Sequence, residues 1–313
     1  MPANQFTAPE AAAVAARLVQ KDGFLSALVS SNYKDEFLGA GRANAPVQIK
    51  VPTSLFMRSR AIEDVTTAIV LDSITETTKT FNLSKVHDYS AVGLSEFDLN
   101  LALKDFASQV LAPQAEAIVE GQEHKIATTL QAVPVTEGLT YDPADPVRYF
   151  TRLRKMLRDN GASQAGLQVL VGTNVYADLL DAKAITDASE SGTSEALREG
   201  QVGRIRGFTI VETNRLDEDE VVAFHRDAVT LITRAPAVPK GASFGSIISE
   251  KGVSLRYLQD YDANVTQDRS ILSTFSAVGI LPTFKRVRNE ETKTATFEEV
   301  PNGGVIHTQV TRA

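Results

Sequence analysis

Cysteine and tryptophan are both absent from this 313-residue sequence, and histidine occurs only four times. Without cysteine there are no disulfides, no thiolate zinc sites and no cysteine nucleophiles, which agrees with a protein made in a reducing cytoplasm. The histidines are scattered and form none of the H-E-x-x-H or H-x-x-E-H pairings that bind zinc; they are His87, His124, His225 and His307. We therefore expect no metal, no other cofactor and no catalytic residue.

Long apolar runs and an excess of basic charge are also missing. No stretch approaches the ~20 apolar residues of a membrane span, and residues 1–18 lack the charged start and cleavage site of a signal peptide. With 32 basic and 39 acidic residues the formal net charge is −7, which argues against a dedicated nucleic-acid binder. The charge does not exclude DNA nearby, because a container that packs DNA benefits from low affinity for the phosphates, and each phosphate that it neutralised would add affinity.

The motifs of common enzymes are missing too. The glycines near residue 203 do not have the G-x-G-x-x-G spacing of a dinucleotide site, and neither a phosphate-binding G-x-x-x-x-G-K-[ST] loop nor a G-x-S-x-G nucleophile turn occurs. The acidic run Asp217–Glu220 can bind a divalent cation, although such a run more often stays solvated. His225 has an arginine and an aspartate after it, but one histidine without a partner at known distance is poor evidence of catalysis. We predict a non-enzyme; an α/β enzyme without a recognisable motif is the rival from another class.

The residues that are present include enough apolar side chains, 43% of the sequence, for two core-bearing units. The alanine-rich residues 8–31 predict a helix with a break at Gly23. Such a helix buries little by itself, so its partner is either a neighbouring chain or its own core, and the sequence leaves both open.

A long two-stranded projection is predicted between Met57 and Lys85, after a strand at Val47–Val51. Phe81 and Leu83 lie on one face of it, and polar side chains lie on the other. A hairpin of this length needs a partner surface to be stable in water. That partner is either another chain or the sheet of the same chain.

Two helices are predicted next. The first starts at a capping-box-like Ser95 and Asp98, and Pro113 stops it and opens the second. Apolar side chains recur at helical spacing along both helices: Leu99, Leu103, Phe106 and Val110, then Ile118, Val119, Ile126 and Leu130. Pro134 ends the second helix.

A third helix is predicted to begin at Asp145 and Pro146 and to end at Gly161. One of its faces is basic and consists of Arg148, Arg152, Lys155 and Arg158. Such a stripe is more often a solvated face or a contact with another chain than a surface for DNA. A buried strand at Leu167–Gly172 follows, and then a helix capped by Thr173 or Asn174.

The segment Leu197–Arg234 is the most informative part of the sequence. It contains a helix end, a glycine turn, a strand, an acidic surface loop and a second strand that runs into a short helix at Ala223–Ala228. We expect Gly207 to have a backbone conformation that a β-branched residue cannot adopt. After Pro236 come two β-rich runs, 253–261 and 270–281, and the polar residues after Lys285 predict a short strand pair or an ordered tail.

The run Gly203–Asn214, GRIRGFTIVETN, and the following AFHRDA resemble the axial domain of tailed-phage major capsid proteins of the Hong Kong 97 fold. That family commonly has "G-x-I-x-G-F-x-V-x-x-S/T-N" before "A-F-H-x-x-A", and the order of the other elements agrees over nearly the whole chain. The resemblance implies an α+β fold with an N-terminal helical arm at 1–45, an extended E-loop hairpin at 46–92, a peripheral domain with a long spine helix at 93–140, an axial α/β domain at 141–238, the returning β-strands of the peripheral domain at 239–285 and a C-terminal tail at 286–313.

The same resemblance implies a major capsid protein that self-assembles into hexamers and pentamers of an icosahedral shell around double-stranded DNA. Its location would be the virion capsid, after assembly in the host cytoplasm. The implied partners are copies of the chain, a scaffolding protein, a portal and decoration proteins, with no membrane and no sequence-specific DNA binding. An encapsulin-like compartment around a cargo enzyme is the alternative.

Some relatives join their subunits by an isopeptide bond between a hairpin lysine and an asparagine of the peripheral domain. Lys79, Lys85 and Asn264 occupy the corresponding parts of this sequence, but no glutamate can be placed beside them. We therefore predict non-covalent shells, which would give a single band near the chain mass after boiling in detergent. A ladder of multimers would contradict this prediction.

Overall fold

The computed structural model describes residues 7–22, 24–32, 44–51, 53–64, 66–74, 77–84, 86–94, 106–182, 204–242, 244–250, 253–263 and 267–311. The chain divides into two compact units, each built from three segments of the sequence. The first contains residues 1–46, 82–129 and 230–279, and the second contains residues 47–81, 130–229 and 280–313. No helix within the described ranges is long and apolar enough to cross a membrane.

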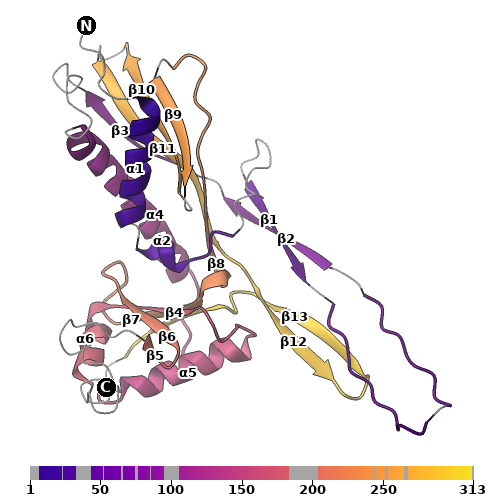
Figure 1. Ribbon diagram of the computed structural model, residues 1–313. Coiled ribbons are helices and arrows are strands. Elements are labelled where there is room, and N and C mark those ends of the chain that lie inside the picture. The colour runs from indigo at the N-terminus through magenta and orange to yellow at the C-terminus, as the bar shows by residue number, and fades with distance from the viewer. Residues whose placement is uncertain are drawn as a thin grey trace. The chain divides into compact units, whose positions relative to one another are not determined.

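The first unit is built on a sheet with the strand order β3–β11–β10–β9 (Figure 1). Its strands are antiparallel along this path: β3 (Val86–Leu94), β11 (Gln267–Ile280), β10 (Val253–Asp262) and β9 (Phe244–Glu250), while β8 (Val229–Arg234) also pairs with β11. The predicted β-rich runs are therefore β10 and β11. β3 was placed in the hairpin region at 46–92, but it pairs with β11 instead. The alternation of side chains indicates the faces of a strand and not its partner.

Two helices, α1 (Ala8–Asp22) and α4 (Ala112–Gln131), share one core with this sheet. The alanines of α1 at positions 11, 12, 15 and 16 have no exposed surface and pack with sheet residues such as Leu255 and Tyr257. Small side chains let the helix approach the sheet closely. The partner of the alanine-rich helix is therefore the core of its own chain. Burial also raises the pKa of Tyr257 to about 12.

The predicted helix at 8–31 is shorter in the structure. A second short helix, α2, covers Leu25–Leu28, and Ser30 already forms a β-bridge with Thr230. The first backbone N–H groups of this turn come from Phe24 and Leu25, and both donate to the carboxylate of Glu123 on α4, at 2.6 and 3.0 Å. The end of the helix is thus fixed by a long-range contact that local propensity does not contain.

The chain enters α4 through a π-helical turn, Ala107–Leu111, without a break. Pro113 lies in the first turn of α4, as expected. It does not stop the preceding helix, because the helical backbone continues from residue 106 into α4. Proline has no N–H and its ring clashes with the carbonyl of residue i−4. Here the N–H of Ala112 bonds to the oxygen of Ala107, five residues earlier, so the wide turn accommodates the ring. The predicted helix start at Ser95 lies outside the described residues.

The predicted projection also differs in its strands. β1 (Asn44–Val51) and β2 (Thr77–Ser84) form a separate two-stranded sheet. Between them, residues 53–64 and 66–74 form no strand, although they are rich in Thr, Ile and Val. Of the two strands expected within Met57–Lys85, the described residues contain one, β2, which includes Phe81 and Leu83. Its partner is β1, which lies before this range. β-propensity depends on packing against neighbouring strands, and most of the side chains at 53–64 and 66–74 are exposed.

The second unit is built on a sheet with the order β14–β7–β4–β6–β5 (Figure 1). Its strands are β14 (Val305–Gln309), β7 (Glu220–His225), β4 (Leu167–Val171), β6 (Phe208–Glu212) and β5 (Arg204–Ile205). β4 and β6 are parallel, and the other pairs are antiparallel. The sheet shares its core with α5 (Pro146–Asp159) and α6 (Thr173–Asp181).

The last part of the chain is not a separate tail at 286–313. β12 (Thr283–Asn289) and β13 (Thr294–Val300) form the expected strand pair. β14 then joins the five-stranded sheet, with Val305 opposite Phe224 of β7. The polar composition after residue 285 gave no indication of this pairing, because the apolar residues of β14 are few.

The predicted ends of α5 are confirmed. Asp145 caps it and accepts the backbone N–H of Arg148 at 3.4 Å, with Pro146 in the first turn. At the other end Gly161 has φ of +89°, and the N–H of Ala162 donates to the oxygen of Leu157 at 3.0 Å, a Schellman-type closure.

The predicted cap of α6 is wrong. Its N-cap is Gly172, and neither Thr173 nor Asn174 caps it. A Cβ atom at Gly172 would lie 2.1 Å from the oxygen of Asp217, so a loop passes too closely for a larger residue. The amide of Asn174 donates instead to Glu218, at 3.3 Å, and to a neighbouring carboxylate of that loop.

Arg206 and Gly207 form the two-residue turn between β5 and β6, with φ of +51° and +89°. Positive φ at both positions is typical of the tight turns that join antiparallel strands. The short helix after β7 covers only Arg226–Ala228. It is shorter than predicted because the residues up to His225 belong to the strand.

Replacing Gly207 with valine is expected to lower the free energy of unfolding by about 1–3 kcal/mol, because a β-branched residue is strained at positive φ. The new Cβ would also lie 3.2 Å from a guanidinium nitrogen of Arg154, which would have to move. Urea unfolding measures the loss. Gly207→Asn is the control, because asparagine tolerates the left-handed region and should lose less. Unchanged unfolding of the valine variant would contradict the prediction.

Candidate interaction surface

The segment between β1 and β2 exposes a group of large apolar side chains. We call residues 53–64 and 66–74 the arm. Met57 is 72% exposed, Leu71 is 88% exposed and Ile62 is fully exposed. The others are Leu55, Ile69, Val70 and Ile74. Since each Å² of apolar surface in water costs roughly 25 cal/mol, such a group typically marks a surface for another protein.

Two arginines tie the sides of the arm together where no strand ladder does. Nη1 of Arg58 lies 2.5 Å from Oδ1 of Asp72, and Nη1 of Arg60 donates to the oxygen of Thr67 at 2.8 Å. Oδ1 of Asp64 accepts the N–H groups of Thr66 and Thr67, both at 3.0 Å. The hydrogen bonds from Thr67 and Thr66 hold the pKa of Asp64 well below its usual range. The two sides of the arm are therefore joined by an ion pair and a hydrogen bond, and Asp64 stabilises the turn between them.

The base of the arm is held by β12 and β13 of the same unit (Figure 1). Nε of Arg286 donates to Oγ of Ser54 and its Nη2 donates to the oxygen of Leu55, both at 2.9 Å. The guanidinium of Arg288 lies 4.3 Å from the centre of the Phe56 ring, and Phe56 is 8% exposed. A fixed base with an exposed outer part is preorganised for binding, because less conformational freedom is lost.

Sequence reasoning missed this anchor. Arg286 and Arg288 were assigned to a polar tail, and Phe56 was not singled out. The signal that could have found them is the spacing of the two arginines, which puts them on one face of a strand. Of the predicted cross-link residues, Lys79 forms an ion pair with Glu299 at 3.2 Å. Lys85 and Asn264 lie outside the described residues.

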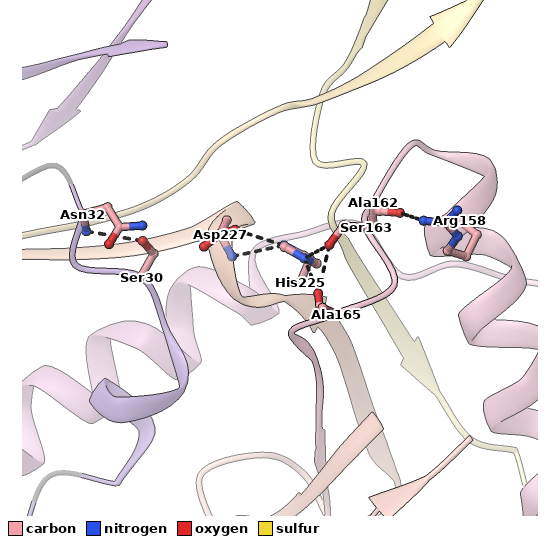
Figure 2. A network of polar contacts seen from close by, with 8 residues as sticks. All are labelled: Ser30, Asn32, Arg158, Ala162, Ser163, Ala165, His225 and Asp227. Atoms are coloured by element: carbon pink, nitrogen blue, oxygen red, sulfur yellow. Dashed lines mark hydrogen bonds and ion pairs between the residues drawn. The ribbon is translucent and has the colours of Figure 1, made fainter. Parts of the chain in front are cut away.

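His225 is buried, and its contacts resemble a Ser–His–Asp trio (Figure 2). Nε2 lies 2.7 Å from Oγ of Ser163 and 2.7 Å from the oxygen of Ala165. Nδ1 accepts the backbone N–H of Asp227 at 3.1 Å, so the ring proton lies on Nε2. A protonated Nε2 cannot take a proton from the serine. The trio therefore braces the turn before β4 against the end of β7.

The acidic run Asp217–Glu220 is only partly a solvated loop. Asp217 and Glu218 are exposed, as expected, but Glu220 is 3% exposed. Its Oε2 accepts the amide of Gln131 at 2.7 Å and the N–H of Asp217 at 3.0 Å. Its Oε1 lies 2.5 Å from Nε2 of His307. Glu220 begins β7 and faces inward, and within the described ranges no three carboxylates or histidines are placed to hold a metal.

The predicted basic stripe on α5 divides into two groups. Lys155 pairs with Asp159 at 2.7 Å, and Nη1 of Arg158 donates to the oxygen of Ala162 at 2.5 Å, as Figure 2 shows for the second contact. Arg148 and Arg152 instead line an open pocket of about 430 Å³. The remaining lining residues are Asp145, Val147, Thr151 and Arg206.

No protein-family model matches the chain, and no curated protein is similar to it. Solved structures are similar. A structure titled "Mycobacterium phage Che8" has a TM-score of 0.58 at 18% identity, over 91% of this chain and 90% of that chain. A structure titled "Mycobacterium phage Bobi" has a TM-score of 0.50 at 12% sequence identity, over 91% of both chains. A structure titled "Asymmetric unit of bacteriophage PhiM1 mature capsid" has a TM-score of 0.47 at 15% sequence identity, over 86% of this chain and 82% of that chain.

These likenesses show the fold. The chain has a mixed helix and sheet architecture that matches phage structures over most of its length. The α+β class expected from the sequence is confirmed, and the fold is similar to that of two mycobacteriophage structures.

Proposed function

We propose that this chain is the major capsid protein of a tailed phage and that its arm docks on a neighbouring copy. The observation that carries the proposal is the arm itself, with its fixed base and its exposed apolar outer part. A soluble protein rarely exposes such a group unless a partner covers it. The similarity of the fold to phage structures supports a copy of the same chain as that partner.

The mechanism of such a shell is geometric. Copies assemble into hexamers and pentamers that close around double-stranded DNA, and each copy makes several modest contacts. Closure makes those contacts simultaneous, so their effects multiply. A scaffolding protein, a portal and decoration proteins are the further partners of this proposal, and the virion capsid is the location. The net charge of −7 supports DNA that is enclosed rather than gripped.

Replacing both Ile69 and Leu71 with aspartate tests the proposal. These side chains are 71% and 88% exposed, so we expect the free energy of unfolding to change by no more than about 0.5 kcal/mol. Shell formation should be lost, because charged groups would have to be buried at the docking site. Negative-stain microscopy and sedimentation of the purified protein measure the outcome.

The matched control is Ile69→Val with Leu71→Met, which keeps the apolar character and should assemble normally. Shells from the aspartate variant that are indistinguishable from those of the parent would refute docking by the arm. A parent chain that never forms shells, rings or sheets would refute the capsid function itself.

A further inference from the structure

Basic side chains gather at one end of the sheet of the second unit. Arg206 lies in the turn that begins β6, and Arg148 and Arg152 come from α5. The three arginines line the open pocket of about 430 Å³. Arg154 ties the helix to the turn, because its Nη1 donates to the oxygen of Arg206 at 2.8 Å. The pocket is therefore built on two connected elements.

The three arginines of this pocket make no ion pair with any residue that the structure describes. Arg58, Arg269 and Arg288, in contrast, each pair with a carboxylate. The one carboxylate in the pocket is that of Asp145, which accepts a backbone N–H as the cap of α5. Guanidinium groups bind carboxylates and phosphates in a bidentate manner. An anionic partner is thus favoured here.

Acidic side chains lie at the opposite end of the same strand. β6 runs from the Arg206–Gly207 turn to Glu212 and continues into the loop that contains Asp217 and Glu218. All three acidic side chains are exposed, and the described residues offer no cation within ion-pair distance of them. A strand of five residues is roughly 16 Å long. The two charged ends therefore belong to different surfaces of the unit.

We propose that the pocket of Arg148, Arg152 and Arg206 binds the acidic loop at Asp217 and Glu218 of a second copy of the chain. The inference rests on the proposed function and names one contact within the assembly. Each copy has one basic surface and one acidic surface, so the contact joins two different surfaces and is heterologous. Repeated around an axis, such contacts form a closed ring when the rotation between neighbouring copies divides a full turn evenly. A single exposed ion pair is weak, but the contact is repeated at every position of the ring.

The alternative occupant of the pocket is the phosphate backbone of DNA. The second copy is favoured because the acidic surface with the matching charge is present on the same unit. It also agrees with the net charge of −7, since copies that repel one another overall need local complementary contacts to associate.

Charge reversal and its combination test the pairing. The basic reversal is Arg152→Glu with Arg206→Glu, and the acidic reversal is Asp217→Lys with Glu218→Lys. Each alone places like charges opposite one another, which opposes association. We expect at least an about tenfold increase in the protein concentration required for assembly. The four substitutions combined restore opposite charges and should return that concentration to within about threefold of the parent. Light scattering and sedimentation measure assembly.

The control is Lys155→Glu, which lies on the same helix outside the pocket and already pairs with Asp159. Thermal unfolding confirms that each variant is folded. Normal assembly of either reversal overturns the inference, and so does a combined variant that fails to recover. If the basic reversal loses co-purifying nucleic acid but assembles normally, the pocket binds DNA, and the inference of a contact between copies is overturned. These outcomes leave the proposed function standing when the parent chain forms shells.

Discussion

Replacing Glu220 with alanine is expected to lower the free energy of unfolding by about 3–5 kcal/mol. The carboxylate is buried. It accepts hydrogen bonds from the amide of Gln131 and the backbone N–H of Asp217, and it contacts the ring of His307. Alanine would leave these polar groups buried without a partner. The desolvation penalty of an unpaired buried group is larger than the net stabilisation that its hydrogen bond provides. Total stability is typically about 5–15 kcal/mol, so a loss of this size is a large part of it. Urea unfolding measures it.

The control for this variant is Glu220→Gln, which keeps the shape of the side chain. Nδ1 of His307 lies 2.7 Å from the oxygen of Val133, so the ring donates there and a proton is needed between Nε2 and residue 220. The glutamine amide can supply that proton, while its carbonyl accepts from Gln131 and Asp217. We expect a loss of no more than about 1 kcal/mol. Equal losses in the two variants would show that the negative charge itself is required.

Local chemistry made part of this fold predictable. The helix α5 begins at Asp145 and ends at Gly161 as the sequence indicates, because a capping carboxylate and a glycine at positive φ act within a few residues. The inward positions of α4, such as Ile126 and Leu130, follow from helical spacing alone. The turn at Gly207 is similarly local. Each of these features is decided by residues that are close in the sequence.

Partners that are distant in the sequence could not be predicted. The pairings of β3 with β11 and of β14 with β7 depend on strands far apart in the chain. The burial of Glu220 depends on His307, and the anchor of the arm joins Phe56 to Arg288. The exposure of the arm was indicated in part, since a weakly apolar projection needs a partner. Its fixed base was not, because composition does not show which surface a polar strand covers.

Replacing Gly172 with alanine is expected to cause the largest steric loss. Its φ of −69° is open to every residue, so backbone strain is not the cause. The new Cβ would lie 2.1 Å from the oxygen of Asp217 and 2.4 Å from that of Glu218. Both are backbone atoms of a loop that is fixed by the N–H of Gly172, which donates to the oxygen of Glu220 at 2.9 Å. The loop must move and these bonds must lengthen, which costs about 3 kcal/mol.

Gly121→Ala is the matched substitution. Gly121 lies within α4, and a Cβ there would have no atom within 4 Å. Alanine loses less backbone freedom than glycine when a helix forms, so this variant should gain about 0.5–1 kcal/mol. The same chemical change should therefore shift the midpoint of urea unfolding in opposite directions at the two positions. A Gly172→Ala variant as stable as the parent would mean that the 217–218 loop does not pass so close to the start of α6, and a loss at Gly121 would mean that a neighbour covers that face of α4.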